Sequence, residues 1–286
     1  MSRIYRSAEG QAAVQGLYRT VLDRWPVPHE ERRIATREGE AFVVVCGPAG
    51  AAPLVLLHGS SANAAMWMAE ARAWSEHFRL HVVDLVGEPG FSAPSRPSLK
   101  SGGFSLWLDE AMSGLGLERA ALVGASLGGW LAVDYAIRRP QRVAGLVLIC
   151  PGGVGRQKPF LLKALPLLLL GPWGRRRMRD KALGGTAPKT IPPALQPFVD
   201  LMAAIFDQFR PRMERLPVFD DTALQGLTVP VLAIVGAKDA LLDSADTRRR
   251  LQGLVAGAEV VMLPEAGHLI RGQAGPILHF LRRTQG

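Results

Sequence analysis

The sequence predicts an α/β fold: a mostly parallel central sheet with helices on both faces and an inserted helical cap. Short apolar, strand-like runs alternate with helical stretches over most of the 286 residues, a pattern that is typical of parallel sheets joined by helical crossovers. The run PLVLL at 53–57 is apolar throughout, as a strand covered on both faces must be. The alternation stops between about 153 and 225, so this segment is predicted to be the insertion.

The individual elements follow from the period of the apolar residues and from breaks at Pro and Gly. PVP at 26–28 ends the first helical pattern, Pro140 ends a later one, and Pro276 suits the first turn of the last. In chain order we expect a helix over 7–25, strands over 32–36, 41–46 and 53–57, a helix over 62–78, a strand over 79–84, a helix over 104–116, a strand over 120–124, a helix over 127–139, a strand over 143–150, a helical stretch over 198–209, a strand over 227–236, a helix over 243–254, a strand over 259–263 and a helix over 276–283.

These elements predict three parts of the chain. They are an N-terminal helical extension at 1–29, a core formed by 30–152 together with 226–286, and a helical cap, or lid, at 153–225. The cap contains an apolar set that either roofs a substrate pocket or packs the cap onto the core: Leu162, Leu165, Leu167, Leu168, Leu169, Leu170 and Trp173. As a roof, this set would favour uncharged acyl or alcohol groups.

The composition excludes several classes of protein. Hydrophobic residues make up 48% of the chain and charged residues 21%, which excludes a disordered protein. Cys46 and Cys150 are too few for a disulfide framework or a multi-cysteine zinc site, and their places at the ends of apolar runs predict buried free thiols. We expect no metal and no organic cofactor. The start of the sequence shows no apolar targeting segment, so we expect a cytoplasmic protein.

The formal net charge of +9 raises the question of a nucleic-acid or anionic-membrane partner. The densest basic groups lie at 175–181 and 248–250, and neither is interleaved with aromatic residues as a single-strand binding groove would be. We therefore expect solvated basic faces and no nucleic-acid partner. The most hydrophobic stretch, 160–170, is well short of the roughly 20 residues of a membrane span, which leaves only peripheral contact through the cap. Monomer and homodimer both stay open.

The segment GASLGG at 124–129 lies where a predicted strand ends and a predicted helix begins. Its G-x-S-x-G pattern is typical of a nucleophile turn, in which a tight bend lifts the serine side chain clear of the sheet. Gly124 and Gly128 flank Ser126 because a Cβ at either position would crowd the turn. We therefore expect Ser126 to be a nucleophile, rather than an incidental serine in a glycine-rich packing turn.

A serine nucleophile needs a base, and the base needs a carboxylate that fixes its tautomer. Of six histidines, His268 follows the strand at 259–263 and so lies at the carboxyl edge of the sheet, where the active sites of open α/β sheets form. Asp239 follows the strand at 227–236 at the same edge, whereas Asp243 suits the N-cap of the next helix. We expect His268 to be the base and Asp239 the acid.

A tetrahedral intermediate needs preorganised amide donors for its oxyanion. The backbone amide of Leu127 lies at a helix N-terminus, and the amide of Ser60 follows the sharp turn at His58 and Gly59. We expect these two amides to form the oxyanion hole. The ring of His58 is expected to tie the turn together by hydrogen bonds, and Asp84 to cap the turn after its own strand.

Taken together, these segments resemble the α/β-hydrolase superfamily, and within it the carboxylesterase-like members with a helical cap. The resemblance spans about residues 30–284 and rests on LLHGSSANAAMW at 56–67, DLVGEPGFS at 84–92, GASLGG at 124–129, VPVLAIVGAKD at 229–239 and LPEAGHL at 263–269. It implies a serine hydrolase that cleaves carboxylic esters of small or medium uncharged substrates through an acyl-enzyme. It also implies Ser126, Asp239 and His268 as the triad, with the amides of Ser60 and Leu127 as the oxyanion hole.

One segment departs from the family pattern. The loop after Asp84 reads VGEPGFS, where relatives have a shorter turn richer in glycine and histidine, and it adds Glu88 near the active edge. The triad is also compatible with a carbon–carbon-bond hydrolase or a cofactor-free perhydrolase, and the fold with a non-catalytic ligand-binding protein. The serine at the turn argues against the epoxide hydrolases and dehalogenases of the superfamily, which need an aspartate there.

Overall fold

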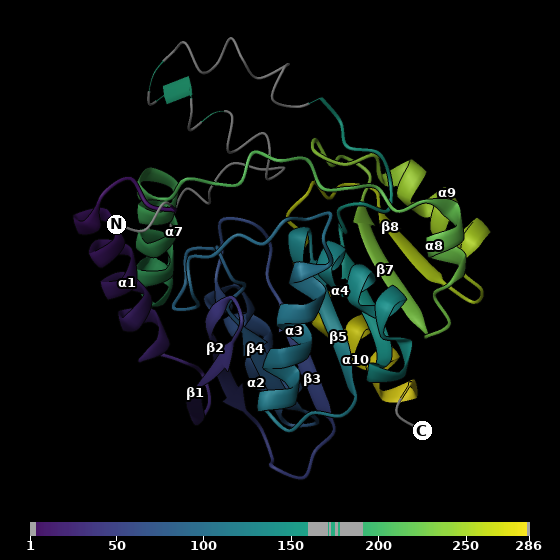
Figure 1. Cartoon of the computed structure of the whole chain (residues 1–286). Coiled ribbons are helices and arrows are strands. Elements are labelled where there is room, and N and C mark those ends of the chain that lie inside the picture. Colours follow the sequence, from purple (N-terminus) through teal and green to yellow (C-terminus); the bar gives the residue numbers. More distant parts are fainter. Residues whose placement is uncertain (1–3, 160–170, 172, 175–176, 178–190, 285–286) are drawn as a thin grey trace.

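The computed structural model describes residues 4–159, 171, 173–174, 177 and 191–284, and an eight-stranded sheet lies at its centre (Figure 1). The strand order is β1-β2-β4-β3-β5-β6-β7-β8. The strands are β1 His29–Thr36, β2 Gly39–Cys46, β3 Pro53–Leu57, β4 Arg79–Val83, β5 Ala120–Ala125, β6 Val143–Ile149, β7 Val231–Gly236 and β8 Glu259–Leu263. β2 pairs antiparallel with β1 and with β4, and the other neighbouring pairs are parallel. The predicted, mostly parallel sheet is confirmed.

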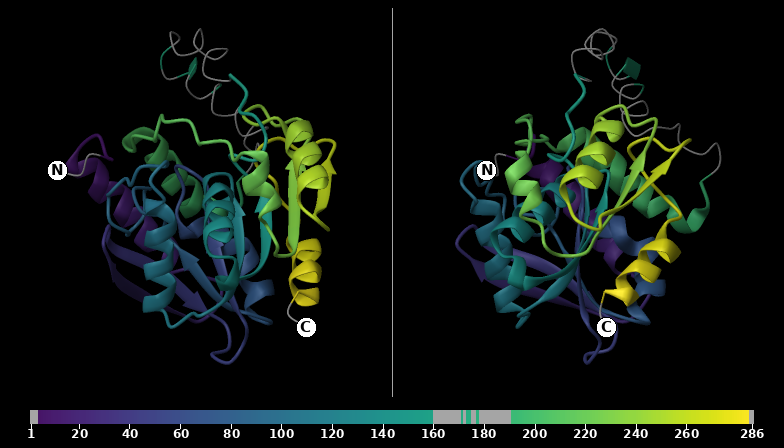
Figure 2. Two further views of the ribbon diagram at one scale, coloured as in Figure 1. Left: turned by 45° about the vertical axis from the view of Figure 1, so that its right-hand side comes forward. Right: turned by 90° about the vertical axis from the view of Figure 1, so that its right-hand side faces the viewer.

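Helices lie on both sides of this sheet, as Figures 1 and 2 show. Residues of α3, α4, α8 and α9 form one apolar core with one side, and residues of α1, α2, α7 and α10 form a second core with the other. The bounds are α1 Ala8–Leu22, α2 Met68–Ser75, α3 Gly103–Gly114, α4 Leu127–Arg138, α7 Gln196–Gln208, α8 Asp221–Gln225, α9 Ser244–Leu254 and α10 Ala274–Arg283, with 3₁₀ turns at Ala64–Trp67, Pro140–Arg142 and Pro193–Leu195. The predicted layering is confirmed.

Alternate residues of each central strand enter the two cores. In β3, Val55 and Leu57 belong to one core, and Leu54 and Leu56 to the other, because successive side chains of a strand point to opposite faces. All four are fully buried. A strand in this position needs an unbroken apolar run, which is why PLVLL could be identified as one.

The helix expected over 62–78 is shorter and begins differently. It starts as a 3₁₀ turn at Ala64 and ends as α2 at Ser75. Asn63 sets this start, because its side chain accepts a hydrogen bond from the Ala65 amide and so caps the turn.

The strand expected over 227–236 begins only at Val231. Pro230 precedes it and has no amide hydrogen to donate to a sheet. Its carbonyl oxygen still accepts a hydrogen bond from the Leu146 amide of β6, at 2.9 Å. The strand therefore starts four residues later than the apolar pattern predicts.

The N-terminal helix α1 packs along α7, which lies in the segment predicted to be the cap (Figure 1). The pairing continues beyond the two helices: Tyr5 forms a β-bridge with Phe209, and the Arg6 amide donates to the Gln208 carbonyl at 2.9 Å. The N-terminal extension and the end of α7 thus share an interface. The boundaries of the three predicted parts stay a prediction.

Most of the apolar set expected to roof a pocket lies outside the described residues: Leu162, Leu165, Leu167, Leu168, Leu169 and Leu170. Trp173 is described and is 57% exposed, with the Arg177 guanidinium over its ring at 5.5 Å. Within the described ranges, every helix is too short or too polar to cross a bilayer.

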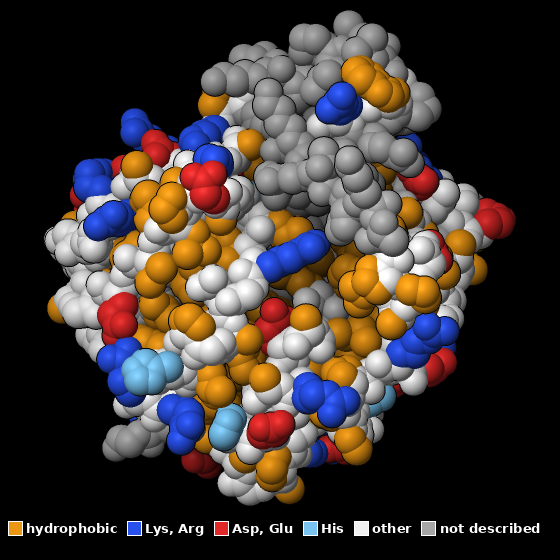
Figure 3. Space-filling model, turned by 180° about the vertical axis from the view of Figure 1, so that it is seen from behind, with side chains coloured by type: hydrophobic (Ala, Val, Ile, Leu, Met, Phe, Trp, Pro, Cys, Tyr) orange, Lys and Arg blue, Asp and Glu red, His pale blue; other side chains and the backbone are white. Residues whose placement is uncertain are grey.

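The basic side chains are spread rather than gathered. Figure 3 shows Lys and Arg distributed between acidic and hydrophobic side chains on one face. In the group at 248–250, the expectation of a solvated basic face is wrong for Arg250, which is 7% exposed and forms an ion pair with Asp221 at 2.6 Å. Arg249 also forms an ion pair, with Asp246, at 2.6 Å. Much of the other group, at 175–181, lies outside the described residues.

Candidate active site

Ser126 lies in the tight turn that joins β5 to α4. Its backbone has φ 50° and ψ −107°, a strained conformation for a residue with a side chain. The turn is closely packed, since a Cβ on Gly124 would lie less than 3.0 Å from the Gly128 carbonyl oxygen. A Cβ on Gly128 would also lie less than 3.0 Å from the carbonyl oxygen of Leu57 at the end of β3. The packing reason given for both glycines is therefore confirmed.

The loop after β8 brings His268 over this turn. It lies on the end of β7, because the Lys238 amide donates to the Ala266 carbonyl at 2.9 Å. The approach is close enough that a Cβ on Gly236 would lie less than 3.0 Å from the carbonyl oxygens of Ala266 and Gly267. Two neighbouring strand ends thus fix the position of the imidazole.

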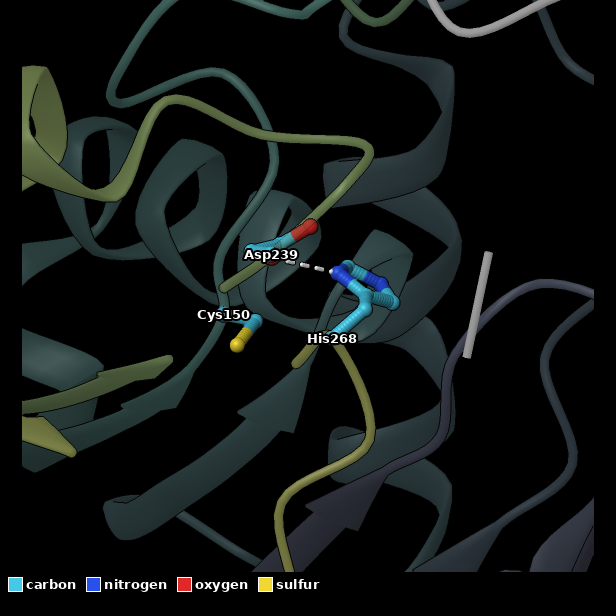
Figure 4. Close-up of side chains that lie close together, drawn as sticks. All are labelled: Cys150, Asp239 and His268. Carbon is cyan, nitrogen blue, oxygen red and sulfur yellow. Dashed lines mark hydrogen bonds and ion pairs between the residues drawn. The ribbon is translucent and has the colours of Figure 1, made fainter. Parts of the chain in front are cut away.

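A continuous chain of hydrogen bonds joins the three predicted side chains. His268 Nε2 lies 3.0 Å from Ser126 Oγ, and His268 Nδ1 lies 2.7 Å from Asp239 Oδ2. Figure 4 shows the Asp239–His268 pair, with Asp239 and His268 reaching toward each other from different loops. Because the carboxylate faces Nδ1, the ring proton belongs there, which leaves Nε2 free to accept the serine proton.

Asp239 is held as a buried anion. It is 2% exposed, and its second carboxylate oxygen accepts hydrogen bonds from the amides of Leu241 and Leu242 at 2.7 and 3.0 Å. Burial acts to raise the pKa of this carboxyl, but the hydrogen bond and charge of His268, together with the two amides, outweigh it, so the pKa is below the usual aspartate value. Asp239 is therefore suited to stabilise an imidazolium. Lys158 Nζ donates to its main-chain carbonyl at 2.7 Å.

Cys150 lies behind this pair. Its thiol, Asp239 and His268 each offer an atom, and these atoms lie within 4.8 Å of one another (Figure 4). Burial and the neighbouring Asp239 charge raise the pKa of the thiol to about 12, so the sulfur is a neutral thiol rather than the thiolate that binds metals. With Nδ1 and Oδ2 bonded to each other, the cluster is suited to orient an imidazole and poorly suited to hold a metal.

The loop at 58–61 lies beside Ser126. A Cβ on Gly59 would lie 3.5 Å from the Ser126 Cβ, so the loop passes directly over the serine. His58 ties the turn together as expected: Nδ1 lies 2.7 Å from the Gly59 carbonyl, and Nε2 accepts from the Leu85 amide at 2.9 Å. Burial lowers the pKa of His58 to about 4, which keeps the ring neutral and able to accept.

The two amides expected to form the oxyanion hole belong to the two segments next to Ser126. Leu127 is the first residue of α4, and Ser60 follows Gly59 in the loop that packs on the serine. Neither amide has a hydrogen-bond acceptor within the part of the chain that the structure describes. Both are therefore free to donate to a ligand atom.

Asp84 directly follows β4 and holds three separate segments. Its carboxylate accepts hydrogen bonds from the Ala64 and Phe91 amides, each at 2.8 Å, and from the Tyr18 hydroxyl at 2.9 Å. The expectation that Asp84 caps the following turn is confirmed, with two further partners that no local pattern indicates. Burial raises the pKa of this carboxyl to about 6.

Sequence reasoning missed several contributors to the site. Lys158 and Cys150 contact Asp239 from the segment that ends and follows β6, and Tyr18 reaches Asp84 from α1. None of them carries a local signal, because each contact joins residues far apart in the chain. Glu88 did carry one, as part of the loop that departs from the family pattern.

The family model for the alpha/beta hydrolase family matches residues 54–276, and the chain belongs to this family. It is 31% identical to carboxylesterase YbfK of Bacillus subtilis (strain 168), over 88% of this chain and 86% of that protein. It is 28% identical to the uncharacterized carboxylesterase nap of the same organism, over 88% and 85% of the two chains.

Solved structures agree with these relatives. The crystal structure of carboxylesterase CesB (YbfK) from Bacillus subtilis matches with a TM-score of 0.79 at 28% identity, covering 97% of this chain and 98% of that one. The naproxen esterase (carboxylesterase NP) from the same organism matches with a TM-score of 0.81 at 25% identity, covering 98% of each chain. The likeness therefore extends over nearly the whole molecule.

Proposed function

We propose that this protein is a serine carboxylic-ester hydrolase in which Ser126 is the nucleophile, His268 the base and Asp239 the acid. The observation that carries the proposal is the unbroken chain of contacts from Ser126 Oγ to His268 at 3.0 Å and from His268 to Asp239 at 2.7 Å. Its similarity to two carboxylesterases over most of their length supports ester hydrolysis. Esters of small or medium uncharged substrates are the expected class.

The chemistry follows from these positions. Ser126 Oγ attacks the ester carbonyl while His268 Nε2 takes its proton, which forms a tetrahedral intermediate. The imidazolium, stabilised by the Asp239 carboxylate, then gives the proton to the leaving alcohol as the C–O bond breaks. Water attacks the resulting acyl-enzyme with the same base, which releases the acid and restores the serine.

The oxyanion of each tetrahedral intermediate would be held by the amides of Ser60 and Leu127. The Leu127 amide lies at the N-terminus of α4, where the helix dipole also favours negative charge. Loss of one such donor typically costs about 3 kcal/mol of transition-state stabilisation. The free state of both amides supports this assignment.

The rival functions are less well supported. A carbon–carbon-bond hydrolase or a perhydrolase would use the same three side chains, but the relatives described above, which align over most of this chain, are carboxylesterases. A non-catalytic binding protein has no need of an aligned nucleophile, base and acid.

Labelling with a fluorophosphonate tests the proposal directly. We expect a covalent adduct on the peptide that contains Ser126, and neither adduct nor hydrolysis of a panel of p-nitrophenyl esters in Ser126→Ala. Ser105→Ala is the matched control, because this buried serine on α3 has no hydrogen-bond partner among the described residues and should label as the wild type does. An adduct elsewhere, or ester turnover that survives in Ser126→Ala, would refute the assignment.

A further inference from the structure

Glu88, the acid in the loop that departs from the family pattern, is buried against the proposed oxyanion loop. Its side chain is 2% exposed although it lies in a loop. Oε2 accepts a hydrogen bond from the Ser61 amide at 2.6 Å and lies 3.5 Å from the Ser60 hydroxyl. The carboxylate therefore contacts the two residues that follow Gly59.

Ser61 needs such a partner because its backbone is strained. Its φ is 59°, in the left-handed region that residues with side chains rarely adopt. A strained backbone persists only when its surroundings hold it in place. The short hydrogen bond from the Ser61 amide to Glu88 stabilises the strained backbone directly after Ser60.

The conformation of the loop from 84 to 92 places the Glu88 carboxylate against Ser61. Gly87 has φ 76°, and a Cβ there would lie less than 3.0 Å from the Ser95 carbonyl oxygen, so the chain turns where a side chain does not fit. Beyond Glu88, the Pro89 carbonyl accepts a hydrogen bond from the Asn63 side chain at 2.9 Å. On the other side of the Glu88–Ser61 contact, the Leu85 amide donates to His58 Nε2 at 2.9 Å, so the two loops are joined on both sides.

We propose that Glu88 is a positioning residue whose carboxylate, by holding the Ser60–Ser61 backbone, aims the Ser60 amide at the oxyanion. The inference rests on the proposed function, since it concerns the oxyanion hole of the same site. Glu88 does not touch the substrate in this role. It acts through the loop, so its loss is expected to lower kcat more than it changes KM.

The surroundings of Glu88 make this hold dependent on pH. Burial raises the pKa of its carboxyl to about 7, although the Ser61 amide and the positive charges of Arg96 and Arg212 act in the opposite direction. Tyr5, from the N-terminal segment, is a further titratable group near Glu88, and burial with the charges of Asp84 and Glu88 keeps that phenol protonated. Above pH 7 the carboxylate is ionised and accepts strongly, and below pH 7 a neutral acid accepts more weakly.

Kinetics of two Glu88 variants on a p-nitrophenyl ester test the inference. Glu88→Ala should lower kcat by roughly 10- to 100-fold with KM changed by less than about twofold. Glu88→Gln keeps a carbonyl oxygen for the Ser61 amide and should retain kcat within about threefold of the wild type at pH 8. Asp134→Asn is the matched control: this acid is also buried, but it lies within α4 and pairs with Arg138.

The pH profile separates positioning from a general structural role. The ratio of wild-type kcat/KM to Glu88→Gln kcat/KM should rise by up to about threefold as the pH rises through 7, because only the wild type gains a charged acceptor there. Taking the ratio at each pH cancels the protonation of all other groups. A ratio that stays constant between pH 5 and pH 8, an unchanged kcat in Glu88→Ala, or a higher kcat in Glu88→Gln would overturn the inference.

Hydrogen exchange of the peptide at 58–67 provides a readout that needs no turnover. Faster exchange in Glu88→Ala than in the wild type and Asp134→Asn is expected at pH 8, and near-wild-type exchange in Glu88→Gln. If Glu88→Ala does not fold, hydrogen exchange of the same peptide in Glu88→Gln and in the wild type, each measured at pH 8 and pH 6, still tests the inference. If the wild type is inactive but its loop exchanges more slowly than the loop of Glu88→Ala, ester hydrolysis is refuted and the positioning of the loop by Glu88 is not. If the wild type is active and Glu88→Ala exchanges at the same rate, only the positioning role of Glu88 is refuted.

Discussion

Gly128, near the start of α4, lies tightly against the backbone at the end of β3. A Cβ there would lie less than 3.0 Å from the carbonyl oxygens of Leu57 and His58, and backbone atoms cannot swing aside as a flexible side chain can. Gly128→Ala should therefore push α4 away from β3, lower kcat/KM at least about 100-fold and destabilise the protein by about 2 kcal/mol or more. Ester kinetics and denaturant unfolding measure both effects.

Gly253→Ala provides the matched control. Gly253 also lies in a helix, α9, but nothing lies within 4 Å of a Cβ built on it. This variant should keep full activity and gain about 0.5–1 kcal/mol from the better helix propensity of alanine. Similar losses in both variants would show that the close approach at Gly128 has no special weight.

The meeting of Ser126, Asp239 and His268 could be predicted from the sequence, because each follows a strand whose carboxyl end lies at one edge of the sheet. The contacts of Lys158 and Cys150 with Asp239 could not. Their segment leaves the end of β6, and only the packed structure shows that it returns beneath Asp239.

At the scale of elements, α1 is tied to the candidate site through one hydroxyl. Tyr18 is fully buried and donates to Asp84, which in turn accepts the amide of Ala64 after the oxyanion loop. Tyr18→Phe removes the donor but leaves the buried carboxylate, so we expect a loss of about 1–3 kcal/mol in the free energy of unfolding. Thermal and urea unfolding measure this loss.

Tyr5→Phe is the comparison for this substitution. Tyr5 is also buried, but its hydroxyl has no hydrogen-bond partner in the described part of the chain. Its removal should change the free energy of unfolding by less than about 0.5 kcal/mol or stabilise the protein. A loss in Tyr5→Phe as large as in Tyr18→Phe would contradict a specific role for the Tyr18–Asp84 bond.

The order and type of most elements could be predicted because the central strands are covered on both faces and are apolar runs. Their ends could be predicted less well. The start of β7 depends on Pro230, which has no amide hydrogen, and the start of the helical stretch after β3 depends on a cap by Asn63, where the apolar pattern suggested Ala62. At both positions, the hydrogen bonds of the cap or of the sheet determine where the element starts, rather than the spacing of the apolar residues.

For the whole molecule, buried acids and buried histidines act in opposite directions on stability. Burial raises the pKa of Asp84 to about 6 and of Glu88 to about 7, so the folded protein keeps protons that the unfolded chain releases, and stability falls as pH rises through this range. Burial lowers the pKa of His58 and His81 to about 4, so their contribution is lost as pH falls. The two effects largely offset each other between pH 4 and 7.

Removal of one buried acid should change how the free energy of unfolding depends on pH. Relative to the wild type, Glu88→Gln should gain about 2 kcal/mol in the free energy of unfolding between pH 5 and pH 8, because it lacks the carboxyl that ionises against burial. Urea unfolding of both proteins at the two pH values measures the gain. Glu76→Gln, a glutamate replaced at an exposed position, is the control for the substitution itself. A difference between Glu88→Gln and the wild type that stays constant with pH would contradict the assignment.

The pairing of α1 with α7, and of Tyr5 with Phe209, limits which segments related proteins can exchange by recombination. A relative that exchanged the segment containing α7 would receive one side of an interface whose other side lies at the opposite end of the sequence. Recombination between such proteins should therefore succeed only where both pieces move together. The helices α1 and α7 therefore form one structural unit that has to be inherited together, although they lie far apart in the sequence.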